Sequence, residues 1–184
     1  MRTIASFSVL PFVVAVLFAC GESETGSEQE TGASLAGSAP ERLDACSLLS
    51  SEEVAEAFGV AFEEGQLTEH GTGAGESYFS TCVFSAANER ADPTVSLMVR
   101  PSDEVVDPAV ALEAGVEDMR ANVSPDYEME PVPELGEGAG WDPAMAELTV
   151  FRPGLMMMLG AHGGSEVRDR LVQLARTALE RASR

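Results

Sequence analysis

The chain has no lysine, and its eleven basic residues, all arginines, are set against 31 acidic residues. The resulting formal net charge of −20 argues against nucleic-acid binding, because phosphate recognition needs clustered cations that release counterions. The same acidity argues against electrostatic attachment to a membrane surface. Histidine is also scarce, with His70 and His162 as its two occurrences, whereas carboxylates are so numerous that a pair of them identifies no site.

Long apolar runs are missing except at the amino terminus. Residues 4–19 carry no charge and follow the short positive start Met1-Arg2-Thr3, which is the layout of an export signal. The run is about 16 residues long, shorter than the roughly 20 that a helix needs to span a bilayer. Pro11 weakens a stable span further. We therefore predict that residues 1–19 form a signal peptide.

The apolar run ends in Leu17-Phe18-Ala19-Cys20-Gly21, which resembles the lipobox of bacterial lipoproteins. The resemblance implies that the chain is cleaved before Cys20 and that its thiol carries a diacylglycerol, often with a further palmitate-type chain on the new amino group. Several acyl chains together give a stable anchor. Gly21, rather than Asp, is compatible with passage to an outer membrane, so the anchor is expected in the cell membrane or the outer membrane. A plain secretory signal and an uncleaved anchor are the alternatives.

Residues 21–40 are rich in Gly, Ser, Thr and Glu, with Leu35 as the only large apolar side chain. Such a segment cannot bury enough surface to offset its ordering entropy, so we predict a disordered tether with a reach of roughly 25 Å. It could alternatively be a docking peptide. The remaining residues 41–184 suit one domain with one core.

If Cys20 is lipidated, Cys46 and Cys82 form an even pair in an exported protein, which predicts a disulfide bond. Buried free thiols and a reactive cysteine are the alternatives. No histidine lies near either cysteine in the sequence to activate it.

Periodicity predicts a short helix after the capping box Ser50-x-x-Glu53, ending at Gly59. Strands are expected at 60–62, at 77–86 and at 94–99. In the second of these, alternation places four residues on one face, namely Tyr78, Ser80, Cys82 and Phe84.

The second half predicts a helix that begins at Asp107-Pro108 and strands at 146–151 and 155–159, joined by a turn at Arg152-Pro153-Gly154. A closing helix follows, capped by Ser165 and carrying an apolar stripe from Val167 to Ala182. The prediction is therefore an α+β fold, with an antiparallel sheet of about five or six strands flanked by three helices and one disulfide.

Several short motifs together resemble an actinobacterial-type envelope lipoprotein family of unknown function. They are Asp44-Ala45-Cys46-Ser47-Leu48-Leu49-Ser50, Cys82-Val83-Phe84 and the loop from Val132 to Ala139, followed by paired strands and an alanine-rich helix. The resemblance covers nearly all of residues 41–184. It implies an extracytoplasmic α+β domain and carries no established activity.

Four features offer candidate chemistry, each with a simpler structural interpretation. Met156–Met158 with His162 could bind Cu(I), but strand alternation favours a strand buried on both faces. The loop 136–140 lacks the Lys and Ser/Thr of a phosphate loop and is predicted to be a turn. Asp103, Glu104 and Asp107 lack the spacing of a calcium loop and fit a solvated turn. We predict no metal and no cofactor.

Trp141 is the fourth feature. It could border a ligand pocket, or it could anchor the preceding loop in the core, which is the favoured interpretation. The sequence thus predicts a non-catalytic binding or accessory module of the cell envelope, recognising an envelope protein or a small apolar ligand. The alternative is an envelope-associated hydrolase that uses His70 or His162 as its base.

Overall fold

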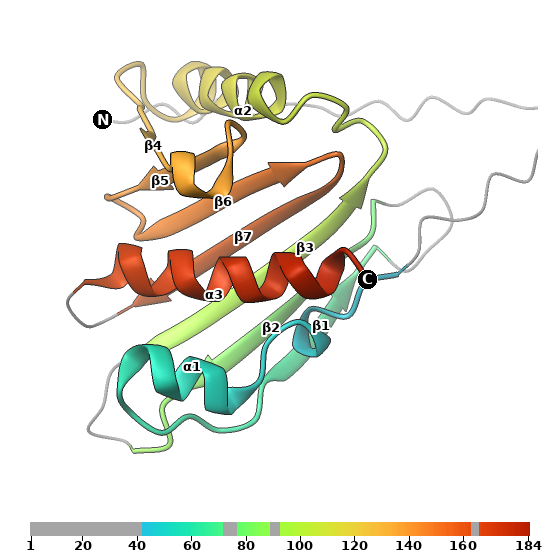
Figure 1. Ribbon diagram of the computed structural model, residues 1–184. Coiled ribbons are helices and arrows are strands. Elements are labelled where there is room, and N and C mark those ends of the chain that lie inside the picture. Colours follow the sequence, from blue (N-terminus) through green and yellow to red (C-terminus); the bar gives the residue numbers. More distant parts are fainter. Residues whose placement is uncertain (1–41, 72–76, 89–92, 163–165) are drawn as a thin grey trace, which may run out of the picture. The chain divides into compact units, whose positions relative to one another are not determined.

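A computed structural model describes residues 42–71, 77–88, 93–162 and 166–184 (Figure 1). The predicted signal peptide, Cys20 and the tether lie outside these residues. The described elements include three α-helices, α1 (Ser51–Phe58), α2 (Pro108–Asn122) and α3 (Val167–Ala182), and two 3₁₀ helices, η1 (Ala45–Ser47) and η2 (Pro133–Leu135). None of the helices in these ranges has the length and apolar content to cross a bilayer.

A seven-stranded sheet forms the centre of the domain, with every neighbouring pair antiparallel. Its strand order is β1-β2-β3-β7-β6-β5-β4. The strands are β1 (Gln66–His70), β2 (Phe79–Ser85), β3 (Thr94–Ser102), β4 (Glu130–Pro131), β5 (Ala139–Asp142), β6 (Glu147–Arg152) and β7 (Gly154–His162). The predicted α+β fold with three helices and one disulfide is therefore confirmed, although the sheet has more strands than the five or six expected.

The hydrophobic core lies on one face of this sheet. Alternate residues of the central strands point into it, so that Leu97 of β3, Leu159 of β7 and Leu148 of β6 lie in one register row and are all fully buried. Helix α3 packs across β6 and β7 on this face and contacts α1 (Figure 1). The predicted apolar stripe of α3 is confirmed, since Leu171, Ala175 and Ala178 are completely buried.

Helix α2 contacts β5 and β6 and has no buried residue of its own. A side chain at Gly140 of β5 would meet Leu112 of α2, and one at Gly138 would meet Pro108. Neither glycine points into the core face, because the residue between them, Ala139, does. Close approach to these two glycines therefore brings α2 onto the opposite face of the sheet, over β5 and β6.

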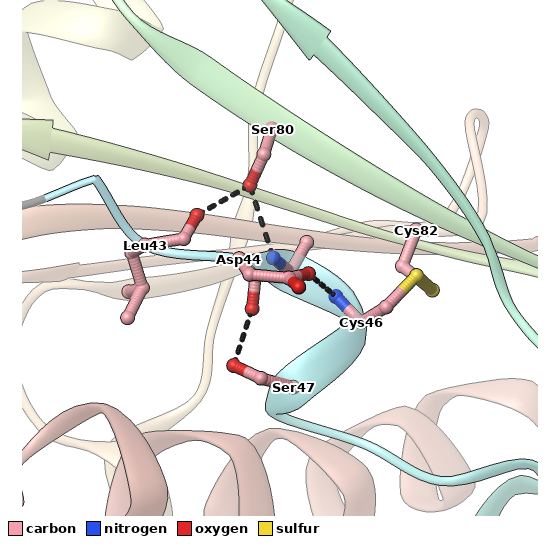
Figure 2. The surroundings of a disulfide bond; sticks show 7 residues. Leu43, Asp44, Cys46, Ser47, Ser80 and Cys82 are labelled. Carbon is pink, nitrogen blue, oxygen red and sulfur yellow. Dashed lines mark hydrogen bonds between the residues drawn. A yellow bond between two sulfur atoms is a disulfide. The ribbon is translucent and has the colours of Figure 1, made fainter.

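Hydrogen bonds and a disulfide hold the first described residues against β2 (Figure 2). The fully buried Ser80 donates a hydrogen bond to the Leu43 carbonyl (2.6 Å) and accepts one from the Ala45 N–H (3.0 Å). Two residues along the strand, Cys82 forms the predicted disulfide with Cys46. Together these bonds hold η1 against β2, and both β2 residues point to the core face.

Helix signals in the sequence predicted their elements well. Ser50 and Glu53 form the expected capping box of α1, and Gly59 ends that helix with a φ of 72°. Asp107 accepts hydrogen bonds from the backbone N–H groups of Ala109 and Val110, and Pro108 is the first residue of α2. At α3, Ser165 lies outside the described residues, and Glu166 occupies the N-cap position without a side-chain hydrogen bond.

Strand predictions were less accurate where apolar alternation is weak. The strand expected at 60–62 is wrong, because Phe62 makes only an isolated bridge to Ala86 and packs edge-on against Phe58. The first strand is instead β1, a sheet edge whose five residues are all exposed and therefore show no alternation. The turn predicted at 136–140 is wrong in part, since Ala139 and Gly140 belong to the buried strand β5.

The methionine run is also corrected. Met157 is fully buried, but Met156 and Met158 are only half-buried, so β7 is buried on one face rather than on both. The predicted turn before it is confirmed, with Arg152 and Leu155 as partners and Gly154 at a φ of 78°.

We expect replacement of both Cys46 and Cys82 by Ala to lower the free energy of unfolding by roughly 3 to 4 kcal/mol. The reason is that the disulfide links residues 36 apart and restricts the unfolded chain. Urea denaturation of the oxidised protein and the double variant measures the difference. Equal midpoints would contradict a stabilising role for this bond.

Candidate functional site

A cleft of about 900 Å³ lies at the end of the domain where the described chain begins. Figure 1 shows the first described residues beside the end of α3, and Leu43 and Arg184 both line this cleft. Its walls come from the end of β3, the β6–β7 turn, η2 and the last turns of α3. The lining includes Leu43, Pro101, Asp103, Glu134, Leu135, Arg152, Pro153, Leu155, Arg176, Leu179, Glu180, Arg181 and Arg184. We call it the tether-end cleft.

Four of the eleven arginines of this acidic chain line the tether-end cleft. Arg181 is committed to Glu53, as described below, whereas Arg152, Arg176 and Arg184 form no ion pair within the described part of the chain. Glu134 lies 3.4 Å from Arg168, and Asp103 and Glu180 add negative charge to the walls. The cleft thus offers guanidinium groups that are available to a ligand, beside carboxylates.

The floor of the same cleft is apolar. Leu135 and Leu179 are 3% and 9% exposed and belong to the core cluster, and Leu43 and Leu155 pack against it. Apolar surface beside a small number of charged groups is found in sites for small organic ligands. The lining therefore matches a ligand that has an apolar part and a charged head group.

Arg181 links α3 to the start of α1 at the edge of the cleft. Its guanidinium donates hydrogen bonds to Glu53 Oε2 (2.8 Å) and to the Leu48 carbonyl (3.0 Å), and it pairs with Glu53 Oε1. Burial raises the pKa of Glu53, but the hydrogen bond from Arg181, the bond from Ser50 and the Arg181 charge outweigh it. The pKa of this carboxyl is therefore lowered from 4.5. The capping glutamate thus also fixes one wall of the cleft.

A second cleft, of about 260 Å³, lies beside α2. Ala111 and Ala114 of α2 face Arg100, Phe151 and Met156 of the sheet across it. It is smaller than the tether-end cleft and lies on the other face of the sheet.

A buried carboxylate lies on that face as well. Asp142 is 3% exposed and accepts hydrogen bonds from the Ala144 and Met145 N–H groups, so it shapes the turn before β6. Burial, a hydrogen bond to Asp142 and the charges of Asp142 and Glu147 raise the pKa of Tyr127 to about 12. Burial and the Asp142 charge likewise raise the pKa of Glu147. Because Asp142 accepts hydrogen bonds from two backbone N–H groups and also from Tyr127, it has a structural role here.

Trp141, the predicted pocket residue, lies in the core. It is 7% exposed, points to the face covered by α3 and lines neither of the two clefts. This burial agrees with the favoured interpretation of the sequence, in which Trp141 anchors the preceding loop in the core.

The two histidines do not come together. His70 pairs with Phe79 and stacks on its ring at 4.5 Å, whereas His162 lies in the register row of Thr94 and Ser85. Phe79 and Ser85 are the two ends of β2, roughly 20 Å apart along the strand. His162 is also distant from Met156, which lies six residues earlier in β7. Within the described residues no cluster of three or more His, Cys, Asp or Glu side chains is arranged to hold a metal ion.

The arginines of the tether-end cleft were not predicted from the sequence. Arg152 ends strand β6, Arg176 lies in α3 and Arg184 follows that helix, so no spacing in the sequence connects them. The sequence shows only that basic residues are scarce, and the structure shows that four of the eleven arginines lie in one cleft.

Comparison of the chain with protein-family models, with curated proteins and with solved structures finds no match. The structural interpretation therefore rests on the chain itself.

We expect Glu53→Gln to destabilise the domain at neutral pH, because the substitution removes an acceptor of charge-assisted hydrogen bonds from Arg181. An acid with a lowered pKa stabilises the fold above its unfolded value and loses this effect as the pH falls. The difference in melting temperature from wild type should thus shrink below pH 4.5. Glu52→Gln, on the same helix turn, is the control. A pH-independent difference would contradict the ion pair.

We expect the ultraviolet titration of tyrosinate to show a late component near pH 12, and Tyr127→Phe to abolish it. Because the folded state keeps Tyr127 protonated, its contribution to stability should be lost as the pH rises from 10 through 12. Tyr78→Phe is the control that leaves the component in place. Persistence of the late component in Tyr127→Phe would refute the assignment.

Proposed function

We propose that the chain is a lipid-anchored binding module of the cell envelope, held at the membrane through Cys20 and exposed outside the cytoplasm. The lipobox-like Leu17-Phe18-Ala19-Cys20-Gly21 supports the anchor. The Cys46–Cys82 disulfide fits an oxidising compartment, where such bonds persist. The resemblance to an envelope lipoprotein family points to the same location.

The observation that carries the binding role is the tether-end cleft. It combines an apolar floor with three arginines that have no ion-pair partner among the described residues. We propose that it takes a small amphipathic ligand whose charged head group contacts Arg152, Arg176 or Arg184. The histidines of the alternative hydrolase lie outside the lining of this cleft, and no described contact favours that alternative.

The position of the tether-end cleft suits a ligand that comes from the membrane or its vicinity. Leu43, the second described residue, lines the cleft, so the cleft lies at the point where the tether leaves the domain. With a tether reach of roughly 25 Å, this end of the domain samples the volume close to the head groups. The acidity of residues 21–40 keeps the tether itself away from an anionic surface.

The anchor is tested by labelling cells with palmitate. Wild type should incorporate label and sediment with membranes, and Cys20→Ala should lose both properties. The control is the double variant Cys46→Ala/Cys82→Ala, which should still be labelled. Unlabelled wild-type protein would overturn the anchor.

The cleft is tested by native mass spectrometry of the full chain released from detergent, with a zwitterionic and an anionic short-chain phospholipid as added probes. Arg152→Gln combined with Arg176→Gln should weaken retention of at least one probe by about tenfold. Arg120→Gln on α2 is the matched control, because Arg120 lies outside the cleft and contacts the Tyr127 carbonyl. Retention of neither probe by wild type, or equal loss in the control, would overturn the proposal.

A further inference from the structure

Among the described residues, no helix covers one face of the sheet across four adjacent strands, β1, β2, β3 and β7. Side chains on this face are the alternate residues Gln66 to His70, Phe79 to Ser85, Thr94 to Arg100 and Met156 to His162. Helices α1 and α3 cover the other face. Helix α2 covers β5 and β6 and borders the open face near Arg100 and Met156. We call these four stretches the open face.

The open face has an unusual charge for this protein. None of its alternate residues is Asp or Glu, although the chain has 31 acidic residues. Its ionisable side chains are His70, Arg100 and His162, and Glu69 of β1 points to the opposite side, where it accepts a hydrogen bond from Tyr78. The open face is therefore a surface on which two copies of a −20 chain can meet without opposing carboxylates.

The chemistry of the open face also suits contact with another sheet. Met98 and Met158 are direct register partners at its centre, with Thr81 next to Met98. All three side chains are only partly buried. Methionines adapt to irregular partners, and sheets pack face to face about 10 Å apart through such side chains.

Size sets the strength of such a contact. Four strands at about 4.8 Å spacing and seven residues at about 3.3 Å give roughly 450 Å² of plane per copy. The sum for two copies, roughly 900 Å², is below the 1,200 Å² or more of stable soluble complexes and indicates a weak pairing. Confinement to one membrane raises the effective concentration of anchored copies, which favours a pairing of this strength.

We propose that two copies of this chain associate through their open faces, as a symmetric sheet-on-sheet dimer. A two-fold arrangement brings the same surface of each copy together, so both sides of the interface lack carboxylates. The membrane contribution to this pairing rests on the proposed anchor at Cys20, whereas the surface itself does not.

Thiol cross-linking in membranes tests the dimer, because Cys46 and Cys82 are already oxidised and a lipidated Cys20 does not react. The full chain carrying Met98→Cys should be joined into a species of twice the mass by a short bismaleimide. Met145→Cys is the matched control, since Met145 is 61% exposed but lies off the open face. Adding Thr81→Glu to the Met98→Cys chain should reduce the dimer yield about tenfold, by placing like charges opposite each other.

Cross-linking of Met98→Cys no better than Met145→Cys would overturn the dimer. Cross-linking to a species of another mass would also overturn it, because a different protein would then cover the open face. Palmitate labelling of the same samples separates this proposal from the anchor: labelled but monomeric chains remove the dimer alone, and unlabelled but cross-linked chains remove the anchor alone. A melting curve of the Thr81→Glu chain that matches its parent shows that the fold is retained.

Discussion

Burial of a single face of the sheet beneath α3 is the constraint from which the other features of the domain follow. Leu97, Leu148 and Leu159 form one row across three strands, and α3 supplies Leu171 and Ala175 to cover the core face. Because β-strand side chains alternate, this choice assigns every other residue to the opposite side. The open face, the half-buried methionines and the position of α2 are consequences of that assignment.

The hydrogen bonds of Ser80 and the disulfide of Cys82 hold η1 against the core face of β2. Ser80 and Cys82 are core-facing positions used for a hydrogen-bonding hydroxyl and a disulfide instead of two aliphatic side chains. A side chain at Gly65 would collide with the Cys82 sulfur, so the chain approaches the disulfide closely just before β1. These bonds position η1 and α1, and α1 in turn presents Glu53 to Arg181 at the edge of the tether-end cleft.

The two surfaces lie in different parts of the domain and are proposed for different roles. The tether-end cleft collects arginines and leucines beside the first described residues, whereas the open face is a methionine-bearing sheet surface without carboxylates. A module that binds a ligand in one place and a second copy in another fits an accessory role at the envelope. Neither surface depends on a catalytic residue.

The features that the sequence determined by itself are those that depend on residues close together in the chain or on the number of cysteines. The capping box at Ser50, the Asp107-Pro108 start, the stripe of α3 and the pairing of Cys46 with Cys82 were predictable, because each depends on short-range geometry or on simple counting. Only the tertiary structure decided which polar segments, such as β1, become strands, since an exposed edge needs no apolar alternation. It also decided that Trp141 packs in the core and that distant arginines share a cleft, because both depend on how α3 crosses the sheet.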